Sequence, residues 1–415
     1  MMKKYDRVSF IGLIFFAFMP VLILISRLLY DSNSFVDNII SYQFVYLLLF
    51  PVLLVLLFFN SVHVYREHYC FEKCISILIF IFVSLIISGL FIRGIGEYDF
   101  FGHYYQRESV FTYLFYVFVI LVSASILYCN EGLFNWFIRI FIISGFIVVC
   151  FYLISYLGFI DNFNYDVSAF IFHNSNHFGY FLCMICVCSF LIYVLYNDIF
   201  CYVLFILCGF SIILNDTLGA FLSVLFVCVF FSVFYFIFTR NKSVLIRCII
   251  SYLAFDVLTV ICSKYIDTSL YSLFKLGNEL SAVADSGIDD NLSVGSGRLG
   301  LWVRALKNIS VKPFFGYGIE GMLEYNHLGT PHCEFLQYSA NFGLPVGICY
   351  LLLPIFVFYY FVKNKLYLEN RRVVCLFVAM SYFVSGCVGC SFYYTAVYYW
   401  IFLGFSIEIK NPKSL

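Results

Sequence analysis

Charge is scarce in this 415-residue chain, because only 12% of its residues are Asp, Glu, Lys or Arg. An ordinary soluble domain carries about 25% charged residues, and 63% of this chain is hydrophobic, so the composition excludes a water-soluble enzyme. Acidic and basic residues balance at 24 each, with no basic arm or acidic tail, and nothing in the charge indicates a nucleic-acid partner. The composition predicts an all-α polytopic integral membrane protein.

Motifs for nucleotide, metal and hydrolase chemistry are lacking as well. The chain has no Gly-rich phosphate loop, no nucleophile elbow and no HExxH segment, so we expect neither a cofactor nor a resident metal. His173 and His177 lie four residues apart and could share a helical face, but no carboxylate or third ligand stands near them in the sequence.

Cysteine and aromatic residues, by contrast, are abundant. Most of the 17 cysteines lie inside apolar runs, as Cys183 and Cys186 do, and we expect them to pack as small hydrophobic groups. The Cys387 to Cys390 spacing could form a disulfide or a redox pair, although a single CxxC is a weak signal. Aromatic residues make up 22% of the chain, more than interfacial belts require, and predict aromatic packing between helices.

Apolar runs long enough to cross a bilayer recur along the chain. About 20 such residues span the hydrocarbon core, and segmenting on this length predicts about twelve spanning helices. With the N-terminus inside, fifteen Lys and Arg residues fall on the inner side and three in short outer loops, which supports this count. The predicted spans are 8–30, 39–61, 75–92, 110–128, 137–158, 177–196, 199–214, 219–238, 248–263, 336–362, 373–390 and 394–408.

The spans divide the chain into three parts: helices one to nine over 1–263, a long outer loop over 264–335, and helices ten to twelve over 336–415. In the loop, Ser296 could cap a short amphipathic helix that holds Arg298 in its first turn and lies on the outer membrane surface. Its predicted apolar stripe, on the face opposite Arg304, Lys307 and Asn308, is Leu299, Trp302, Leu306 and Ile309.

The rest of the loop is predicted to be less regular. Gly316, Gly318 and Gly321 predict a flexible turn, and Pro331 and His332 should lead directly into the tenth span. The loop is the only sizeable soluble part of the chain, so its polar residues are the place to look for chemistry.

Histidine and arginine are the strongest chemical candidates on the outer face. His332 could serve as a general base, and Arg298 offers a planar fork that suits phosphate or pyrophosphate. Each also has a structural interpretation, as a hydrogen-bonding interfacial histidine and as a solvated arginine. The other polar candidates are Glu320, Glu324, His327 and Glu334 in the loop, with His173, Asn176 and His177 at another outer helix end.

Several loose motifs occur in a fixed order and carry a resemblance. They are Ser296-Gly-Arg298-Leu-Gly-Leu-Trp302, Lys312-Pro-Phe-Phe-Gly-Tyr-Gly318, Pro331-His-Cys-Glu-Phe-Leu-Gln337 and Phe342-Gly-Leu-Pro-Val-Gly347, preceded by Asn174-Ser-Asn-His-Phe-Gly179. Together they resemble the O-antigen ligase/polymerase superfamily, the Wzy and WaaL proteins of bacterial surface polysaccharide synthesis.

This resemblance implies a GT-C-like, metal-independent, inverting glycosyltransferase of the bacterial cytoplasmic membrane, with its active site facing the periplasm or cell exterior. The substrates would be oligosaccharides on undecaprenyl diphosphate, used to build O-antigen, other lipopolysaccharide, capsule or exopolysaccharide. Membrane lipid and a polysaccharide chain-length regulator are the other expected partners. The implied catalytic residues are His332 as base and Arg298 on the diphosphate, and the expected substrate contacts are Arg304, Glu320, Glu334, Asn176 and His177.

One departure from the resemblance concerns a second arginine. Many ligases carry Ser-Arg-Gly at the outer start of a later helix, where this chain has Leu218 between Thr217 and Gly219. Either Arg93 or Arg107 supplies the missing charge or the site differs, and the absence favours a polymerase. The alternatives are a ligase that transfers glycan to a lipid A core, a transporter of lipid-linked sugars, and a structural or sensor membrane protein.

Overall fold

The computed structural model describes residues 4–29, 73–96, 99–100, 102, 108–129, 131–158, 172, 174–265, 281, 297–319, 330–389 and 393–407. Its regular elements are helices, so the all-α prediction is confirmed for these ranges. They are α1 (Lys4–Leu29), α3 (Lys73–Arg93), α4 (Val110–Cys129), α5 (Glu131–Tyr156), α7 (Ser175–Tyr196), α8 (Ile199–Leu214), α9 (Leu218–Thr239), α10 (Lys242–Tyr265), α12 (Arg298–Val311), α14 (Glu334–Phe342), α15 (Leu344–Lys363), the 3-10 helix η2 (Leu366–Leu368), α16 (Asn370–Gly386) and α17 (Tyr393–Ser406).

Six described helices are long and apolar enough to cross a membrane: α3, α5, α7, α9, α10 and α15. Shorter apolar helical stretches occur in α1, α4, α8 and α17, and the chain is a polytopic membrane protein. The bounds of α8 agree with the predicted span 199–214. The predicted span 39–61 lies outside the described residues, so the total of twelve stays a prediction.

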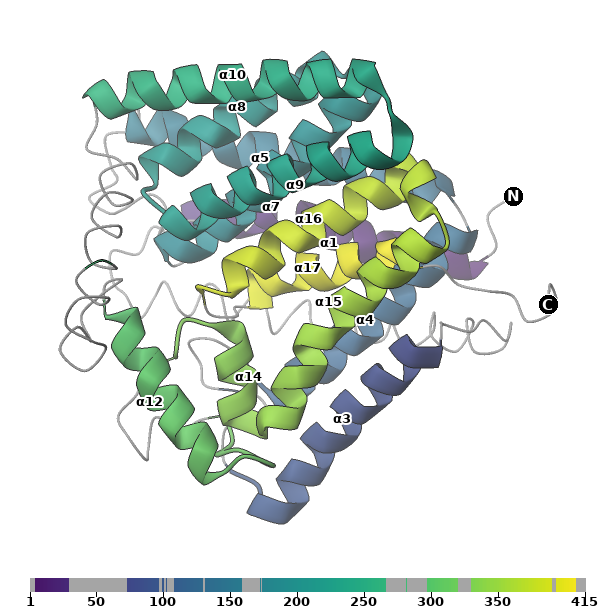
Figure 1. Ribbon diagram of the computed structural model, residues 1–415, viewed down its shortest axis with the longest axis vertical. Coiled ribbons are helices and arrows are strands. Elements are labelled where there is room, and N and C mark those ends of the chain that lie inside the picture. The colour runs from purple at the N-terminus through teal and green to yellow at the C-terminus, as the bar shows by residue number, and fades with distance from the viewer. Residues whose placement is uncertain are drawn as a thin grey trace.

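The helices form a bundle with α10 and α8 along one side, α3 along the other, and α7, α9, α16, α17 and α1 between them (Figure 1). In α7 nearly every residue is buried, and the side chains of Cys183, Cys186 and Cys188 have no exposed surface. These thiols fill the core as small hydrophobic groups, as the sequence predicts. The outermost helices instead expose apolar side chains such as Phe91 of α3 and Val260 of α10.

Aromatic rings join the central helices. The ring of Phe141 in α5 lies 6.0 Å from that of Phe181 in α7, and 5.2 and 5.1 Å from those of Tyr398 and Phe402 in α17, measured between centroids. Ring pairs at such distances contribute about 0.5–1.5 kcal/mol beyond their burial. The aromatic content predicted from composition is therefore used in packing between helices.

The bundle has two distinct ends. At the loop end lie α12, α14 and the start of α7, where the Ser175 carbonyl accepts a hydrogen bond from the Asn215 amide at 2.8 Å. At the opposite end lie the starts of α8 and α16, and there Arg372 donates to the carbonyl of Ile407, after α17, at 2.7 Å. This buried arginine therefore joins the start of α16 to the end of α17.

The predicted tenth span, 336–362, is wrong as a single helix. The chain forms α14, breaks at Gly343 and continues as α15. Gly343 has φ of 99°, which L side chains rarely adopt, and a Cβ there would overlap the carbonyl of Phe314. Pro345 then stands in the first turn of α15, where its missing N–H costs little. His332 therefore leads into a short helix before the spanning one.

The turn at 316–318, predicted to be flexible, is fixed to α14. The amides of Tyr317 and Gly318 donate to the carbonyls of Ala340 and Asn341, each at 2.9 Å, and the Leu344 amide donates to the carbonyl of Pro313 at 2.7 Å. The first two bonds satisfy carbonyls that the end of α14 would otherwise leave without partners, and the third ties the start of α15 to Pro313. The loop is thus anchored where the two helices meet.

Candidate active site

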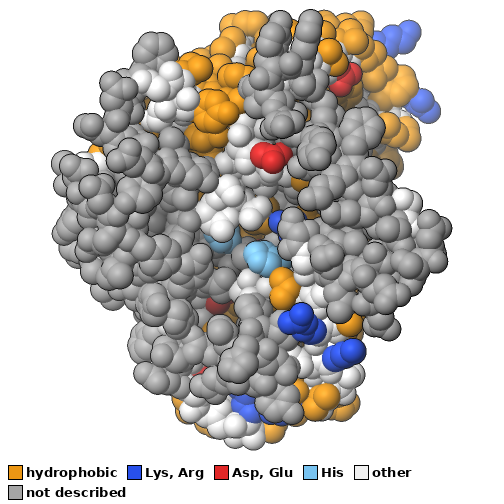
Figure 2. Space-filling view, turned by 90° about the vertical axis from the view of Figure 1, so that its left-hand side faces the viewer, with side chains coloured by type: hydrophobic (Ala, Val, Ile, Leu, Met, Phe, Trp, Pro, Cys, Tyr) orange, Lys and Arg blue, Asp and Glu red, His pale blue; other side chains and the backbone are white. Residues whose placement is uncertain are grey.

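Polar side chains of the loop gather on one face of the molecule. Figure 2 shows this face, with the histidine side chains of the described residues near its middle and Lys or Arg side chains beside them. The described histidines are His177 and His332. Residues from the α7 start and from the loop, far apart in the sequence, thus contribute to the same face.

His332 has an unusual backbone. Its φ is 48°, in the left-handed region, where histidine is more frequent than most residues but where any side chain is held at some cost. The ring is half-buried, and its Nδ1 is buried with no hydrogen-bond partner among the described residues. Such strain is commonly retained where it orients a side chain for function.

Arg298 acts electrostatically on His332. Burial lowers the pKa of the His332 imidazole, and the positive charge of Arg298 lowers it further. Both effects favour the neutral ring, which is the form that can accept a proton. Arg298 is the first residue of α12, as predicted. The two principal candidates of the sequence therefore lie within electrostatic reach of one another.

α12 differs from its prediction in its cap and in its buried face. Its N-cap is Gly297, with φ of 81°, while the predicted cap Ser296 lies outside the described residues. Ile309 is buried as predicted, but Leu306 is 54% exposed and Asn308 is buried. The helix packs on α14 through a small apolar cluster. This cluster is Ala305, Ile309, Leu336 and Ala340.

Glu334 is buried at the start of α14, two residues after His332. Its carboxylate accepts a hydrogen bond from the Tyr382 hydroxyl at 2.6 Å and another from the Tyr350 hydroxyl. Burial raises the pKa of Glu334 to about 7, although the two hydroxyls favour its charged form. A Cβ on Gly386 would lie 3.0 Å from the carboxyl carbon, so the end of α16 packs directly on it.

A layer of buried tyrosines surrounds this carboxylate. The ring of Tyr338 stacks on that of Tyr350 with centroids 4.5 Å apart, and it also contacts Tyr113 of α4 at 4.9 Å. Tyr113 donates its hydroxyl hydrogen bond to a second buried carboxylate, Glu108. The hydroxyls of Tyr113, Tyr350 and Tyr382 thus bond to the two buried carboxylates, while Tyr338 contributes ring contacts.

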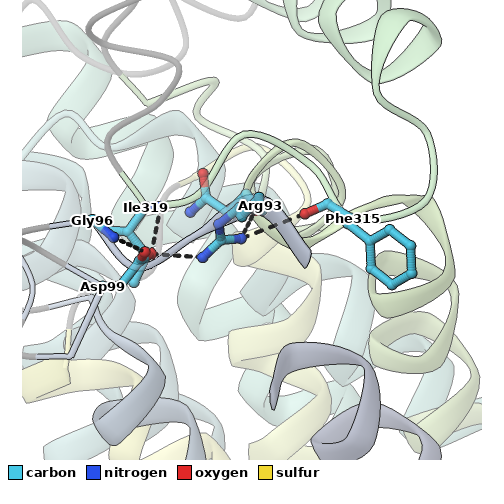
Figure 3. Close-up of polar contacts among 6 residues, drawn as sticks. Arg93, Gly96, Asp99, Phe315 and Ile319 are labelled. Carbon is cyan, nitrogen blue, oxygen red and sulfur yellow. Dashed lines mark hydrogen bonds and ion pairs between the residues drawn. The ribbon is translucent and has the colours of Figure 1, made fainter. Parts of the chain in front are cut away.

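Arg93 lies where the end of α3 meets the loop. Its Nη2 donates to Asp99 at 2.6 Å, and its Nη1 donates to the carbonyls of Phe315 and Asn341 at 3.4 and 3.2 Å (Figure 3). Asp99 also accepts from the amides of Gly96 and Ile319, at 2.8 and 3.5 Å. Arg93 therefore ties α3 to the loop. Arg107 lies outside the described residues.

The start of α7 joins the turn between α8 and α9. Asn174 caps α7 by accepting from the Asn176 amide at 2.7 Å. The side-chain amide of Asn215 donates to the Thr217 hydroxyl at 2.5 Å and to the Ser175 carbonyl. Leu218 then begins α9. Leu218 thus stands beside the α7 start, in the turn where the resemblance led us to seek a second arginine.

A chain of rings connects this turn to the loop. The His177 ring lies 5.9 Å from that of Tyr180, which lies 6.2 Å from the ring of Tyr382, the donor to Glu334. His177 is buried. The structure therefore brings the predicted positions His177 and Glu334 to the same region from opposite parts of the sequence.

Other predicted positions are less informative. Arg304 is exposed on α12, and Asn176 is half-buried at the start of α7. The described residues contain no group of three or more His, Cys, Asp or Glu side chains that could hold a metal. Cys387 is exposed and has a free thiol. The predicted residues His173, Glu320, Gly321, Glu324, His327 and Cys390 lie outside the described residues.

The sequence analysis missed the carboxylate and tyrosines below the loop. Glu108 stands two residues before an apolar helix, at a predicted outer end, and that position was the only signal available for it. Tyr350 and Tyr382 occur within aromatic-rich runs, where nothing separates a hydrogen-bonding tyrosine from a packing one.

The middle of the chain is similar to a known family. Residues 203–351 match the family Wzy_C, described as O-Antigen ligase. The match begins in α8 and ends in α15, so it includes Leu218, Arg298, His332 and Glu334. No curated protein matches the chain.

Proposed function

We propose that this membrane protein is a surface polysaccharide polymerase, because residues 203–351 match the Wzy_C family, whose members act on lipid-linked glycans. It joins undecaprenyl-diphosphate-linked oligosaccharide repeat units on the outer face of the cytoplasmic membrane, as a metal-independent, inverting glycosyltransferase. The observation that carries the proposal is the left-handed backbone of His332 together with the positive charge of Arg298, which with burial lowers the pKa of the imidazole and favours its neutral form.

In the proposed reaction, the growing glycan on its lipid diphosphate is the donor and a sugar hydroxyl of a second lipid-linked repeat is the acceptor. His332 takes the hydroxyl proton as the oxygen attacks the anomeric carbon, and the bond from that carbon to the diphosphate oxygen breaks. Arg298 stabilises the negative charge that grows on the departing lipid diphosphate. Direct attack inverts the anomeric carbon, and the sugar–diphosphate bond supplies the energy.

The remaining predicted residues take supporting roles in this proposal. Asn176 and His177 at the start of α7, together with Arg304 on α12 and Glu320 in the loop, contact the sugars. Glu334 is buried under two tyrosine hydroxyls, so its proposed role is to hold the start of α14 rather than to touch substrate. Holding α14 fixes the backbone of His332, two residues earlier.

A ligase is the second candidate, and the printed description of the family favours it. A ligase transfers one finished glycan to a lipid A core or another acceptor, whereas a polymerase extends the glycan repeatedly. Leu218 supports the polymerase, because many ligases carry an arginine at the corresponding place in the resemblance.

The test is a gel of surface glycan from a deletion strain that carries the wild-type gene, His332→Ala or His332→Asn at matched protein level. Asn tolerates the left-handed backbone but cannot act as a base at neutral pH, so it separates lost chemistry from lost backbone geometry. General bases contribute about 10²- to 10⁴-fold, and we expect both variants to leave single-repeat glycan attached to its acceptor. Lys307→Gln, which removes a charge from the exposed face of α12, should restore the full ladder.

Each other outcome has a clear meaning. If the deletion strain accumulates long polymer on carrier lipid that is not attached to its acceptor, the protein is a ligase. If His332→Asn restores the ladder, the proposed base is wrong even though the family stands.

A further inference from the structure

A cavity of about 610 Å³ lies at the opposite end of the bundle from the candidate active site. It is formed where the start of α5, the end of α7, the start of α8 and the start of α16 meet. Its volume is in the range of small-ligand sites. Nothing in the proposed glycosyl transfer uses it. The residues that matter for its chemistry are Asn135, Arg139, Ile143, Asp198, Phe200 and Arg371.

The length of α7 gives the distance between the cavity and the candidate active site. This helix has 22 residues and begins beside the candidate site at Ser175. At 1.5 Å per residue it is about 33 Å long, close to the thickness of a hydrocarbon core. Tyr196, its last residue, lines the cavity. The cavity therefore lies one bilayer thickness away from the loop, at the membrane face that the Lys and Arg distribution predicts to be cytoplasmic.

The floor of the cavity is apolar and its rim is open. Ile138 and Ile142 on the floor are 7% and 6% exposed, whereas Ile143 and Phe200 at the rim are 49% and 42% exposed. A groove with apolar walls that opens toward the bilayer suits a hydrocarbon chain better than a water-soluble ligand. Arg139, on the same turn of α5 as Ile142 and Ile143, gives this groove a charged end.

The charged end carries more positive than negative charge. Arg139 and Arg371 both line the cavity, and Asp198 is the acidic residue that lines it with them. One oxygen of Asp198 is already used, because it accepts from the Cys201 amide at 3.1 Å as the cap of α8. Two guanidinium groups beside an apolar groove match a phosphate attached to acyl chains. Basic pockets between spanning helices on the cytoplasmic side bind acidic lipid headgroups.

We propose that this cavity binds an anionic phospholipid of the inner leaflet. Its phosphate lies between Arg139 and Arg371, and an acyl chain runs along the isoleucine wall of α5. The lipid joins α5 to α16 at the end of the bundle remote from the loop. This inference depends on the cavity and its charge, and it is independent of which glycan reaction the protein carries out.

The experiment uses the full chain purified in detergent and mixed with phosphatidylglycerol or with phosphatidylcholine, with bound lipid counted by native mass spectrometry. We expect wild type to retain phosphatidylglycerol and to bind phosphatidylcholine about tenfold more weakly. Arg139→Gln and Arg371→Gln should each lower phosphatidylglycerol binding about tenfold, as loss of a charged hydrogen-bonding partner does. Arg240→Gln is the matched control, because Arg240 is exposed near the end of α9 and lies outside the cavity lining.

A second variant tests the apolar wall with both arginines present. Ile143→Trp should fill the rim and lower lipid binding, whereas Ile147→Trp, one turn further along α5 and outside the lining, should not. Both side chains are partly exposed, so tryptophan can be accommodated at either position without overpacking the core.

Three outcomes would overturn the proposal. Equal binding of the two phospholipids would show that charge does not select the ligand. Equal losses in Arg139→Gln and Arg240→Gln would place binding outside the cavity. A retained adduct with the mass of a polyprenyl diphosphate would make the cavity a substrate-lipid site instead.

Discussion

The ion pair between Arg93 and Asp99 permits a sharp test of how the loop is held. The two side chains are 11% and 5% exposed, and Asp99 also accepts from the amides of Gly96 and Ile319. Asp99→Ala leaves the Arg93 guanidinium buried without its carboxylate. Breaking a buried pair in this way costs about 3–5 kcal/mol. The cost falls on the contacts between α3 and the loop, because those are the groups that the pair joins.

Hydrogen exchange measures this cost locally. The amides of Tyr317 and Gly318 donate to α14, so they exchange only when the turn leaves that helix. A loss of about 3 kcal/mol or more corresponds to at least about a hundredfold faster exchange. We therefore expect a peptide covering 313–319 to exchange at least about a hundredfold faster in Asp99→Ala than in wild type. Peptides from the buried centre of α7 should exchange at the wild-type rate.

The double variant Arg93→Met/Asp99→Ala distinguishes a structural arginine from a substrate-binding one. Removing both charges loses the bonds from Arg93 to the Phe315 and Asn341 carbonyls and those from the Gly96 and Ile319 amides to Asp99, about 1 kcal/mol each. It leaves no buried unpaired charge, which is the larger cost in Asp99→Ala. Exchange of the turn should then be slower than in Asp99→Ala, and the glycan ladder, which we expect Asp99→Ala to reduce, should partly return. Unchanged exchange in Asp99→Ala would refute the anchoring role. A ladder still absent in the double variant, despite a protected turn, would return Arg93 to the diphosphate.

Three further predictions follow from single side chains. Burial raises the pKa of Glu334 to about 7 in the folded protein, against 4.5 for the free group, so the folded state holds the proton more tightly. The free energy of unfolding should therefore fall by about 3 kcal/mol as pH rises from about 4.5 through about 7. Melting temperatures measured over this pH range should fall in wild type and not in Glu334→Gln, and parallel curves would contradict the prediction. Gly343→Ala places a methyl group against the Phe314 carbonyl, so the folded yield of the protein should fall strongly. Gly94→Ala is the control, because Gly94 also has a positive φ, 86°, but nothing lies within 4 Å of the added carbon. Equal losses in the two variants would mean that backbone strain alone is responsible. The proposed transfer needs a neutral His332, and burial and Arg298 lower the pKa of this imidazole from its ordinary 6.5. Activity should therefore be lost only as pH falls below about 6.5, and a midpoint above that value would count against His332 as the base.

The sequence predicted the helices well, because an apolar run of membrane length leaves few alternatives in lipid. It also placed Arg298 in the first turn of a loop helix. It failed at the tenth span, where hydropathy alone joined α14 to α15. The break there depends on a tertiary contact, since the carbonyl of Phe314 occupies the space beside Gly343. Residues nearly 30 positions apart create that contact, and no local pattern reports it.

The candidate site divides in the same way. His332 and Glu334 could be found from their place beside an outer helix end, but the partners of Glu334 could not. Tyr350 and Tyr382 come from two later helices, and their hydroxyls meet the carboxylate only in the assembled bundle. The contacts of Arg93 were hidden for the same reason, because the sequence shows its charge but not the carbonyls of Phe315 and Asn341 that accept from it.

The anchored turn also bears on how such a protein can be altered. Main-chain bonds fix the turn at 313–318 to the end of α14, and the tyrosine bonds to Glu334 fix the start of that helix. The ten positions 320–329 therefore join two segments whose register is set independently of them. We therefore expect that their length and composition can be changed while Arg298 and His332 keep their places. Exchanging these ten positions between related chains would test whether they set the sugar preference of the proposed transfer.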